Sequence, residues 1–253
     1  MLRALGNGEA GMSAMQRALD TIANNLANLD TNGYKSQTVD FADLLYQAGA
    51  PSGFPPAAAG QDAQLGAGTR VAAIGQNLSQ GNLRQTNRPL DLAIHGPGYF
   101  AVTGPGGRPL YTRDGHFDLN AKGQLVNSAG DVLAPGVTLP AGYQSVKVSG
   151  DGQVTVTEAG GQTSQPGVIP LYTFADPQGL ARMGGNLYQA TPASGLAARS
   201  GTGRIVQGSL EQSNVSLIGQ MTDLITVERA YQFDSKAVQT VDAMWTLANG
   251  LYQ

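Results

Sequence analysis

The chain has 253 residues, which is long enough for one large domain or two small ones with a sizeable buried core. Only 13% of the residues are charged, the formal net charge is −3, and the 15 lysines and arginines contain no run of three, so no surface is suited to follow a nucleic-acid backbone. There is no cysteine, which excludes thiolate catalysis, disulfide bonds and cysteine-ligated metals, and the 35 glycines and 13 prolines indicate many turns between short strands.

The first residues do not resemble a secretory leader. Residues 1–9 lack the apolar core of about 7–15 residues that a Sec-type signal peptide requires. No apolar run in the chain approaches the roughly 18 residues of a membrane span. If the protein leaves the cytoplasm, we therefore expect it to do so by another route and without cleavage of a signal peptide.

A helix with one apolar stripe is predicted near the N-terminus. Apolar residues recur at alternating spacings of three and four, which is the heptad pattern of a packed helix face. This N-terminal seam comprises Met12, Met15, Leu19, Ile22, Leu26 and Leu29. Residues 30–33 are expected to end the helix, with Gly33 in the left-handed conformation, and we assign residues 1–47 to this helix and the turn that follows it.

Three asparagines interrupt this helix although asparagine is a poor helix former. Asn24, Asn25 and Asn28 each cost about 0.5 kcal/mol relative to better helix formers. One interpretation is a solvated helix face. The other is that their amides form hydrogen bonds across a packed helix interface and fix its register.

The middle of the chain changes to the alternating pattern of strands. Residues 48–68 are rich in Gly, Pro and Ala and are expected to form a linker or an extended arm. Residues 145–149 and 153–157 alternate around Gly150-Asp151-Gly152, which predicts a β-hairpin. Further short strands are predicted at residues 90–95, 99–103, 124–126 and 168–174. We therefore assign residues 69–205 to a β-rich outer domain.

A second seamed helix is predicted in residues 206–253. One row of apolar residues is spaced by seven, and a second row fills the alternate heptad positions except at Asp234. This C-terminal seam comprises Leu217, Leu224, Val227, Tyr231, Val238, Val241 and Trp245. The expected fold class is α+β, in which the N- and C-terminal helices pack as a coiled-coil-like pair, an inner-core domain, beside a central domain of short antiparallel strands. Since one helix cannot bury its own stripe, the seams must pack on each other, on the β domain or on other copies.

Two features of the sequence suggest cofactor binding or catalysis, but their surroundings do not support either function. Residues 96–101 match the G-x-G-x-x-A dinucleotide fingerprint, but a strand rather than a helix is predicted to follow it. His95 and His116 are the only histidines and have no catalytic or metal-ligand spacing, so we interpret them as a strand-end and a hairpin residue. No catalytic, cofactor-binding or metal-binding residue is predicted, and the chain is not expected to be an enzyme.

Several blocks resemble the rod and hook proteins of the bacterial flagellum, in the same order and over nearly the whole chain. The first is residues 22–35 (IANNLANLDTNGYK). The others are residues 81–86 (GNLRQT), 90–100 (LDLAIHGPGYF), 111–117 (YTRDGHF), 210–215 (LEQSNV), 228–232 (ERAYQ) and 235–238 (SKAV). Within the family, residues 41–47 (FADLLYQ) and 64–71 (QLGAGTRV) look like blocks of its distal-rod members.

The resemblance implies a structural subunit of the distal rod that polymerises into a hollow helical tube and transmits torque from motor to hook. Its implied partners are other copies of itself, neighbouring rod and hook proteins and the flagellar type III export apparatus, with no nucleic acid, cofactor or small-molecule substrate. The implied location is the basal body, which spans the periplasm if the organism has an outer membrane. The alternatives are another axial protein of the family (proximal rod or hook-like), a β-rich cell-surface binding module, or a hydrolase with an unfamiliar site.

The assembly interface is assigned to the two seams and the three asparagines. Its residues are Met12, Met15, Leu19, Ile22, Asn24, Asn25, Leu26, Asn28, Leu29, Leu217, Leu224, Val227, Tyr231, Val238, Val241 and Trp245. A head-to-tail contact through such surfaces that does not close into a ring generates a helical filament.

Overall fold

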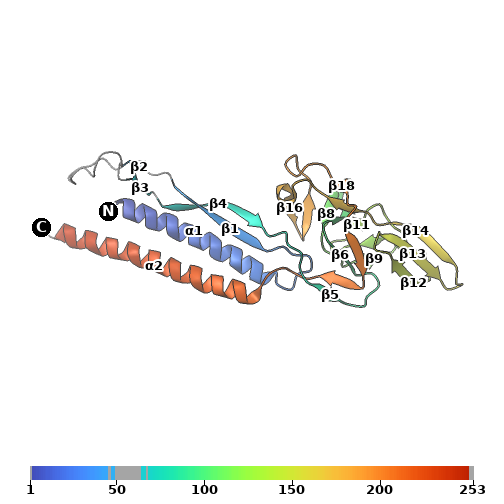
Figure 1. The fold of residues 1–253 in the computed structure, drawn as a ribbon. Helices are drawn as coiled ribbons and strands as arrows, with labels where there is room; N and C mark the ends of the chain where they lie inside the picture. The colour runs from blue at the N-terminus through green and yellow to red at the C-terminus, as the bar shows by residue number, and fades with distance from the viewer. Residues whose placement is uncertain (1, 45–46, 49–63, 67, 251–253) are drawn as a thin grey trace. The chain divides into compact units, whose positions relative to one another are not determined.

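The structure is a computed structural model and describes residues 2–44, 47–48, 64–66 and 68–250 (Figure 1). Two α-helices and a set of short antiparallel strands make up the described part of the chain, which confirms the α+β class. The chain divides into two compact units. The helical unit comprises residues 1–27, 37–75 and 216–253, and the strand unit comprises residues 28–36 and 76–215.

The helical unit consists of two long helices and a β-ribbon. Helices α1 (Leu2–Ala27) and α2 (Leu217–Gly250) lie side by side, and α1 lies between α2 and the ribbon of β1 (Gln37–Asp43) and β4 (Thr69–Gln76) (Figure 1). The helices are antiparallel, because the start of α1 lies beside the late part of α2 and its end lies beside the start of α2. Two short strands, β2 (Gln47–Ala48) and β3 (Gln64–Leu65), pair beyond the ribbon.

Small residues let α1 approach α2 closely. A Cβ atom on Gly8 would lie 2.6 Å from Val238, and one on Gly11 would lie 2.6 Å from the carboxylate of Asp234. The most buried face of α1 continues from there along Gly11, Ala14, Ala18, Thr21, Ile22 and Asn25. A glycine inside a helix costs about 1 kcal/mol of stability relative to alanine. The close packing of α1 on α2 offsets this cost.

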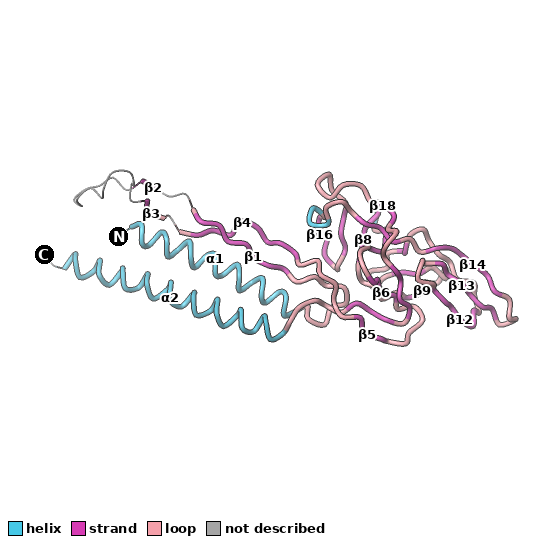
Figure 2. The backbone as a smooth tube through the Cα atoms, viewed as in Figure 1, coloured by secondary structure: helices cyan, strands magenta, loops and turns pink. Residues whose placement is uncertain are grey.

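The strand unit is built around one large antiparallel sheet (Figure 2). Its strand order is β16 (Ala181–Gly184), β17 (Leu187–Gln189), β8 (Pro109–Thr112), β7 (Tyr99–Thr103), β11 (Val132–Leu133), β10 (Leu125–Val126) and β9 (Asp118–Leu119), and β15 (Leu171–Thr173) pairs with both β7 and β18 (Ala198–Arg199). Separate pairs join β6 (Leu92–His95) to β19 (Arg204–Gln207) and β5 (Leu83–Gln85) to β20 (Ser209–Glu211). A three-stranded sheet consists of β12 (Tyr143–Val148), β13 (Gln153–Glu158) and β14 (Thr163–Val168).

Strand β7 supplies side chains to two apolar clusters. Because successive residues of a strand point to opposite faces, Phe100 and Val102 enter the larger cluster, and Tyr99 and Ala101 enter the other. Phe100 packs edge-to-face on Phe117 at 5.4 Å between ring centroids. The strand unit therefore has a core of its own.

Most predicted strands are confirmed, with one correction. The hairpin forms as β12–β13 with Val146 opposite Val156. Strand β7 has the predicted bounds, so residues 96–98 of the glycine-rich fingerprint form the turn between β6 and β7, and its residues 99–101 belong to β7. The segment 168–174 is not one strand, since β14 ends at Val168 and β15 begins at Leu171, with Pro170 between them. Pro170, which has no N–H to donate to a strand partner, lies at this break.

Three further expectations concern the end of α1, the domain boundaries and the Gly/Pro-rich segment. Helix α1 stops at Ala27, so Asn28 and Leu29 lie in the turn after it, while Gly33 does adopt the left-handed conformation at φ +68°. The two compact units divide at residues 27/28, 36/37, 75/76 and 215/216. The domain boundaries at 68/69 and 205/206 stay predictions. Of the Gly/Pro-rich segment 48–68, residues 49–63 and 67 lie outside the described residues. None of the described helices is long and apolar enough to cross a bilayer.

Candidate assembly site

The N-terminal seam flanks the face of α1 that packs on α2. Ile22 is buried, and Met12, Met15, Leu19 and Leu26 are half-buried. Their larger side chains stand one position beyond the row of small buried residues, so they border the helix contact rather than fill it. Leu29 is also half-buried, in the turn after α1. Whether these side chains contact a neighbouring copy stays a prediction.

Asn25 connects three elements of the helical unit. Its side chain is only 1% exposed, and its amide donates to the Gln37 carbonyl of β1 and to the side chain of Gln220 in α2, both at 2.8 Å. Its side-chain oxygen accepts the Gln37 N–H at 2.8 Å. Asn25 thus forms the inter-helix hydrogen bond that the second interpretation of the asparagines requires, here within one chain. Asn24 is exposed and Asn28 is half-buried.

The C-terminal seam lies along the side of α2 that faces α1. Leu224, Val227, Tyr231, Val238 and Val241 are all half-buried, whereas Leu217 and Trp245 at the two ends are exposed. Asp234, which interrupts the seam in the sequence, lies beside Gly11, where the missing side chain leaves room for a carboxylate. None of the α2 side chains described by the structure is fully buried.

The opposite side of α2 carries a second apolar row. Ile218, Ile225, Phe233, Met244 and Leu247 are separated by 7, 8, 11 and 3 residues, so they fall near one helix face. Ile218 is 80% exposed, Phe233 74% and Leu247 73%. A helix that is apolar on two opposite sides is typical of a buried position, and in the single chain only one of these sides is covered. We call this row the outward face of α2.

A groove opens between the three elements of the helical unit. Its volume is about 330 Å³, and it is lined by Ala18 and Ile22 of α1, Val39 and Phe41 of β1, and Asp223 and Val227 of α2, among others. Phe41 is 46% exposed. Among the described residues that line it, Asp223 is the only charged one. We call this the α1–β1–α2 groove.

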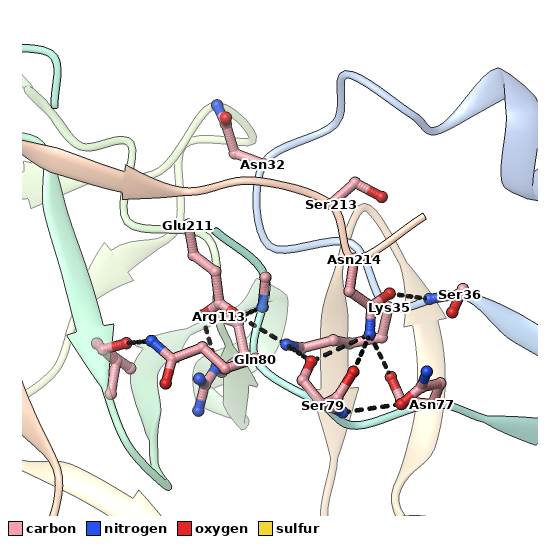
Figure 3. Close-up of polar contacts among 12 residues, drawn as sticks. Asn32, Lys35, Ser36, Asn77, Ser79, Gln80, Arg113, Glu211, Ser213 and Asn214 are labelled. Carbon is pink, nitrogen blue, oxygen red and sulfur yellow. Dashed lines mark hydrogen bonds and ion pairs between the residues drawn. The ribbon is translucent and has the colours of Figure 1, made fainter. Parts of the chain in front are cut away.

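A buried ionic network lies in the strand unit (Figure 3). The carboxylate of Glu211, which is fully buried, accepts from the Lys35 ammonium at 2.5 Å, from Arg113 Nε at 3.0 Å and from the Gly81 N–H at 3.0 Å. Arg113 also donates to the carbonyls of Gly96 and Gly98. Two cations therefore share one carboxylate, and backbone carbonyls accept a further N–H from Lys35 and two from Arg113.

Asn214 extends the network to the neighbouring backbone (Figure 3). Its side-chain oxygen accepts the Ser36 N–H at 2.7 Å, and its amide donates to the carbonyls of Asn77 and Ser79. Lys35 donates to the same Ser79 carbonyl at 2.7 Å. The segments that lead from the strand unit into the helical unit end at residues 28, 36, 76 and 215. Near residues 36, 76 and 215, the chain is thus joined by one set of hydrogen bonds.

Burial sets the electrostatics of this network. It lowers the pKa of Lys35, and the adjacent Glu211 carboxylate opposes that shift. An ammonium in such a place is retained only where it is paired, so Lys35 and Arg113 depend on Glu211. The backbone is equally constrained: a Cβ on Gly81 would lie 1.9 Å from the Gln212 carbonyl oxygen, and no other residue fits there.

The residues of this network stand in the family-like blocks, but no pattern in the sequence pairs them. Lys35, Gly81, Arg113 and Glu211 come from four different blocks, at separations of up to 176 residues. The available signal was that three of these blocks each contain a charged residue, Lys35, Arg113 or Glu211. Hydrophobic periodicity and turn motifs relate residues that are close together in the sequence, so they do not pair residues this far apart.

The two histidines have structural partners. His95 ends β6, and His116 contacts Asp91 and Arg88, while Arg88 also pairs with Asp118. Burial raises the pKa of the nearby Asp114, whose carboxylate accepts the His116 N–H at 3.0 Å and closes the turn. Among the described residues, no group of three or more His, Asp or Glu side chains is placed to hold a metal ion.

Three family models match parts of the chain. A flagella basal body rod protein model covers residues 5–35, a flagellar hook protein FlgE/F/G D1 domain model covers residues 93–156, and a flagellar basal body rod FlgEFG protein C-terminal model covers residues 206–251. These ranges contain most of α1, five strands of the large sheet (β7 to β11), and α2.

Full-length relatives agree with these matches. The flagellar basal-body rod protein FlgG of Borreliella burgdorferi is 38% identical over 99% of both chains. Its namesakes from Agrobacterium fabrum and Bacillus subtilis are each 37% identical, over 98% and 96% of both chains. The resemblance noted in the sequence is confirmed, and the chain belongs to the flagellar basal-body rod protein family.

Proposed function

We propose that this chain is the building block of the distal part of the flagellar rod, and that copies of it assemble head to tail into a hollow helical tube that transmits torque from motor to hook. Members of this family are structural proteins of the basal body, so the chain is a structural component and not an enzyme. In the proposed tube the helical unit forms the inner layer, where α1 and α2 act as a coiled-coil-like pair, and the strand unit forms the outer layer.

The observation that carries the proposal is the second apolar row of α2. The α1-facing side of the helix is covered within the chain, but the outward face remains exposed over its whole length from Ile218 to Leu247. Large exposed apolar surfaces mark interaction sites, and burial of each such side chain contributes about 1.5–3 kcal/mol. A heterologous contact of this kind, repeated without closure, builds a filament.

The strand unit supports the torque-bearing role. Its core is independent of the outward face, so polymerisation does not require it to unfold. The network around Glu211 and Asn214 joins the chain near residues 36, 76 and 215, three of the points at which it leads into the helical unit and at which twisting forces would enter the strand unit. Ion pairs with several directional bonds resist such displacement better than apolar contacts, which have no preferred direction.

The remaining partners follow from the same assignment. We propose that the ends of the tube contact neighbouring rod and hook proteins, and that the chain travels through the flagellar export apparatus without losing a signal peptide. Mass spectrometry of the protein recovered from basal bodies would report an intact N-terminus if this route is correct.

Sedimentation of the purified chain over a range of concentrations tests the proposal. We expect monomers below a critical concentration and sedimenting tubes above it, and we expect the wild-type gene, but not one encoding Phe233→Asp, to restore motility to a rod-deficient strain. Gln144→Asp, which makes the same change of charge at an exposed position of β12 in the strand unit, is the control. A chain that stays monomeric at all concentrations and does not restore motility would refute the proposed function.

A further inference from the structure

We infer that the α1–β1–α2 groove of one copy receives the outward face of α2 from a second copy, with Arg229 of the incoming helix placed against Asp223. This inference rests on the proposed function and specifies which two surfaces of the subunit meet. It names a second copy of this chain as the occupant of the groove.

The groove has the chemistry of a helix-binding site. Ala18 and Thr21 present small side chains from α1, and Ile22, Phe41 and Val227 present large apolar ones. Its volume of about 330 Å³ is more than twice the roughly 150 Å³ of a cavity that accommodates a benzene molecule, so it has room for more than one large side chain. Amphipathic helices bind such grooves through residues one or two turns apart.

The outward face of α2 supplies a matching set of side chains. Ile225 and Phe233 stand eight residues apart, and Arg229 lies midway between them at the same helix side. Lys236 occupies the same side one turn beyond Phe233. The charges within this apolar row are therefore cationic, whereas the charge that lines the groove is the carboxylate of Asp223.

Charge complementarity selects a second copy over contact within the chain. Asp223 and Arg229 belong to the same helix and lie on different sides of it, so one molecule cannot insert its own outward face into its own groove. Two copies can do so, and each copy then still offers one free groove and one free outward face. Such a contact propagates, as the helical tube requires.

Charge reversal distinguishes this contact from every contact within one chain. In Arg229→Asp the reversed outward face meets the unchanged Asp223, and in Asp223→Arg two cations meet, so each single variant should polymerise with a critical concentration raised at least about tenfold. The double variant Asp223→Arg/Arg229→Asp should regain polymerisation. An equimolar mixture of the two single variants should also polymerise, because each groove then finds a face of opposite charge on the other variant.

The mixture of the two single variants distinguishes contact between copies from contact within one chain. If the two residues interacted only within one chain, the double variant would recover but the mixture would not, and the inference would be overturned. It would also be overturned if both single variants polymerised like the wild type, a result that leaves the proposed function intact. Arg199→Asp, an exposed reversal in the strand unit, controls for net charge, and circular dichroism of each monomer confirms that the helices remain folded. Failure of the wild type to polymerise would instead refute the proposed function itself.

Discussion

Replacing Glu211 by alanine should destabilise the strand unit more than any exposed substitution. The change removes the acceptor shared by Lys35, Arg113 and the Gly81 N–H. Lys35 and Arg113 are both buried, so they would be left as uncompensated charges. Breaking a buried pair in this way costs about 3–5 kcal/mol. A domain is stable by about 5–15 kcal/mol, so the strand unit of Glu211→Ala should fold but lose a large part of its stability.

Urea unfolding measures this loss. With a slope of about 2 kcal/mol per molar urea, a loss of about 4 kcal/mol lowers the midpoint by roughly 2 M. Near-ultraviolet circular dichroism follows the strand unit through Tyr99, Tyr111 and Tyr188, which pack together in its second cluster. Fluorescence of Trp245, the only tryptophan, reports on α2 separately.

Two further variants separate charge from shape. Glu211→Gln keeps the side-chain size and an acceptor oxygen but loses the charge, so it should cost an intermediate amount, about 1.5–3 kcal/mol. Glu158→Gln in β13 makes the same chemical change outside the network and should stay within about 0.5 kcal/mol of the wild type. If Glu211→Ala unfolded at the same urea concentration as Glu158→Gln, the network would not stabilise the unit and our reasoning about it would be wrong.

Three other predictions concern assembly, pH and domain boundaries. Leu26→Asp should abolish polymerisation, measured by sedimentation, while the melting transition of the strand unit stays unchanged, and the control Lys147→Asp should do neither; normal assembly of Leu26→Asp would show that the N-terminal seam is not an interface. Burial raises the pKa of Tyr99 to about 12, above its unfolded value, so the stabilisation is complete below pH 10. Urea titrations should show that about 2–3 kcal/mol of the free energy of unfolding is lost as the pH rises from 10 to 12. Tyr99→Phe should lose less over the same pH range, and an equal loss would contradict the assignment. A fragment of residues 69–215 should unfold cooperatively in calorimetry and be more stable than residues 69–205, which lacks β20 and Glu211; equal melting temperatures would mean that β20 is dispensable.

Hydrophobic spacing predicted the helices but not how they pack. The three-four spacing located both seams, and the half-buried row of α2 from Leu224 to Val241 follows it. On α1 the most buried row is instead formed largely by Gly11, Ala14 and Ala18, which a search for large apolar residues overlooks. Their small size is what brings the helix backbones together, so the packing depended on side chains that carry little hydrophobic signal.

Local patterns were sufficient for the strands with tight turns and insufficient elsewhere. The β12–β13 hairpin was predictable because its glycine turn and its alternation lie within about 15 residues. The pairing of β5 with β20 joins residues more than 120 positions apart, and no turn chemistry signals it. The network around Glu211 depends on that pairing, which is why its residues were visible in the sequence but their meeting was not.

Electron cryo-microscopy of polymers grown from the purified chain tests the central claim most directly. We predict hollow tubes in which α1 and α2 surround the lumen, the strand units lie outside, and the outward face of α2 is covered by the next copy. Tubes held together by the strand units alone, with the row from Ile218 to Leu247 still exposed, would contradict this account.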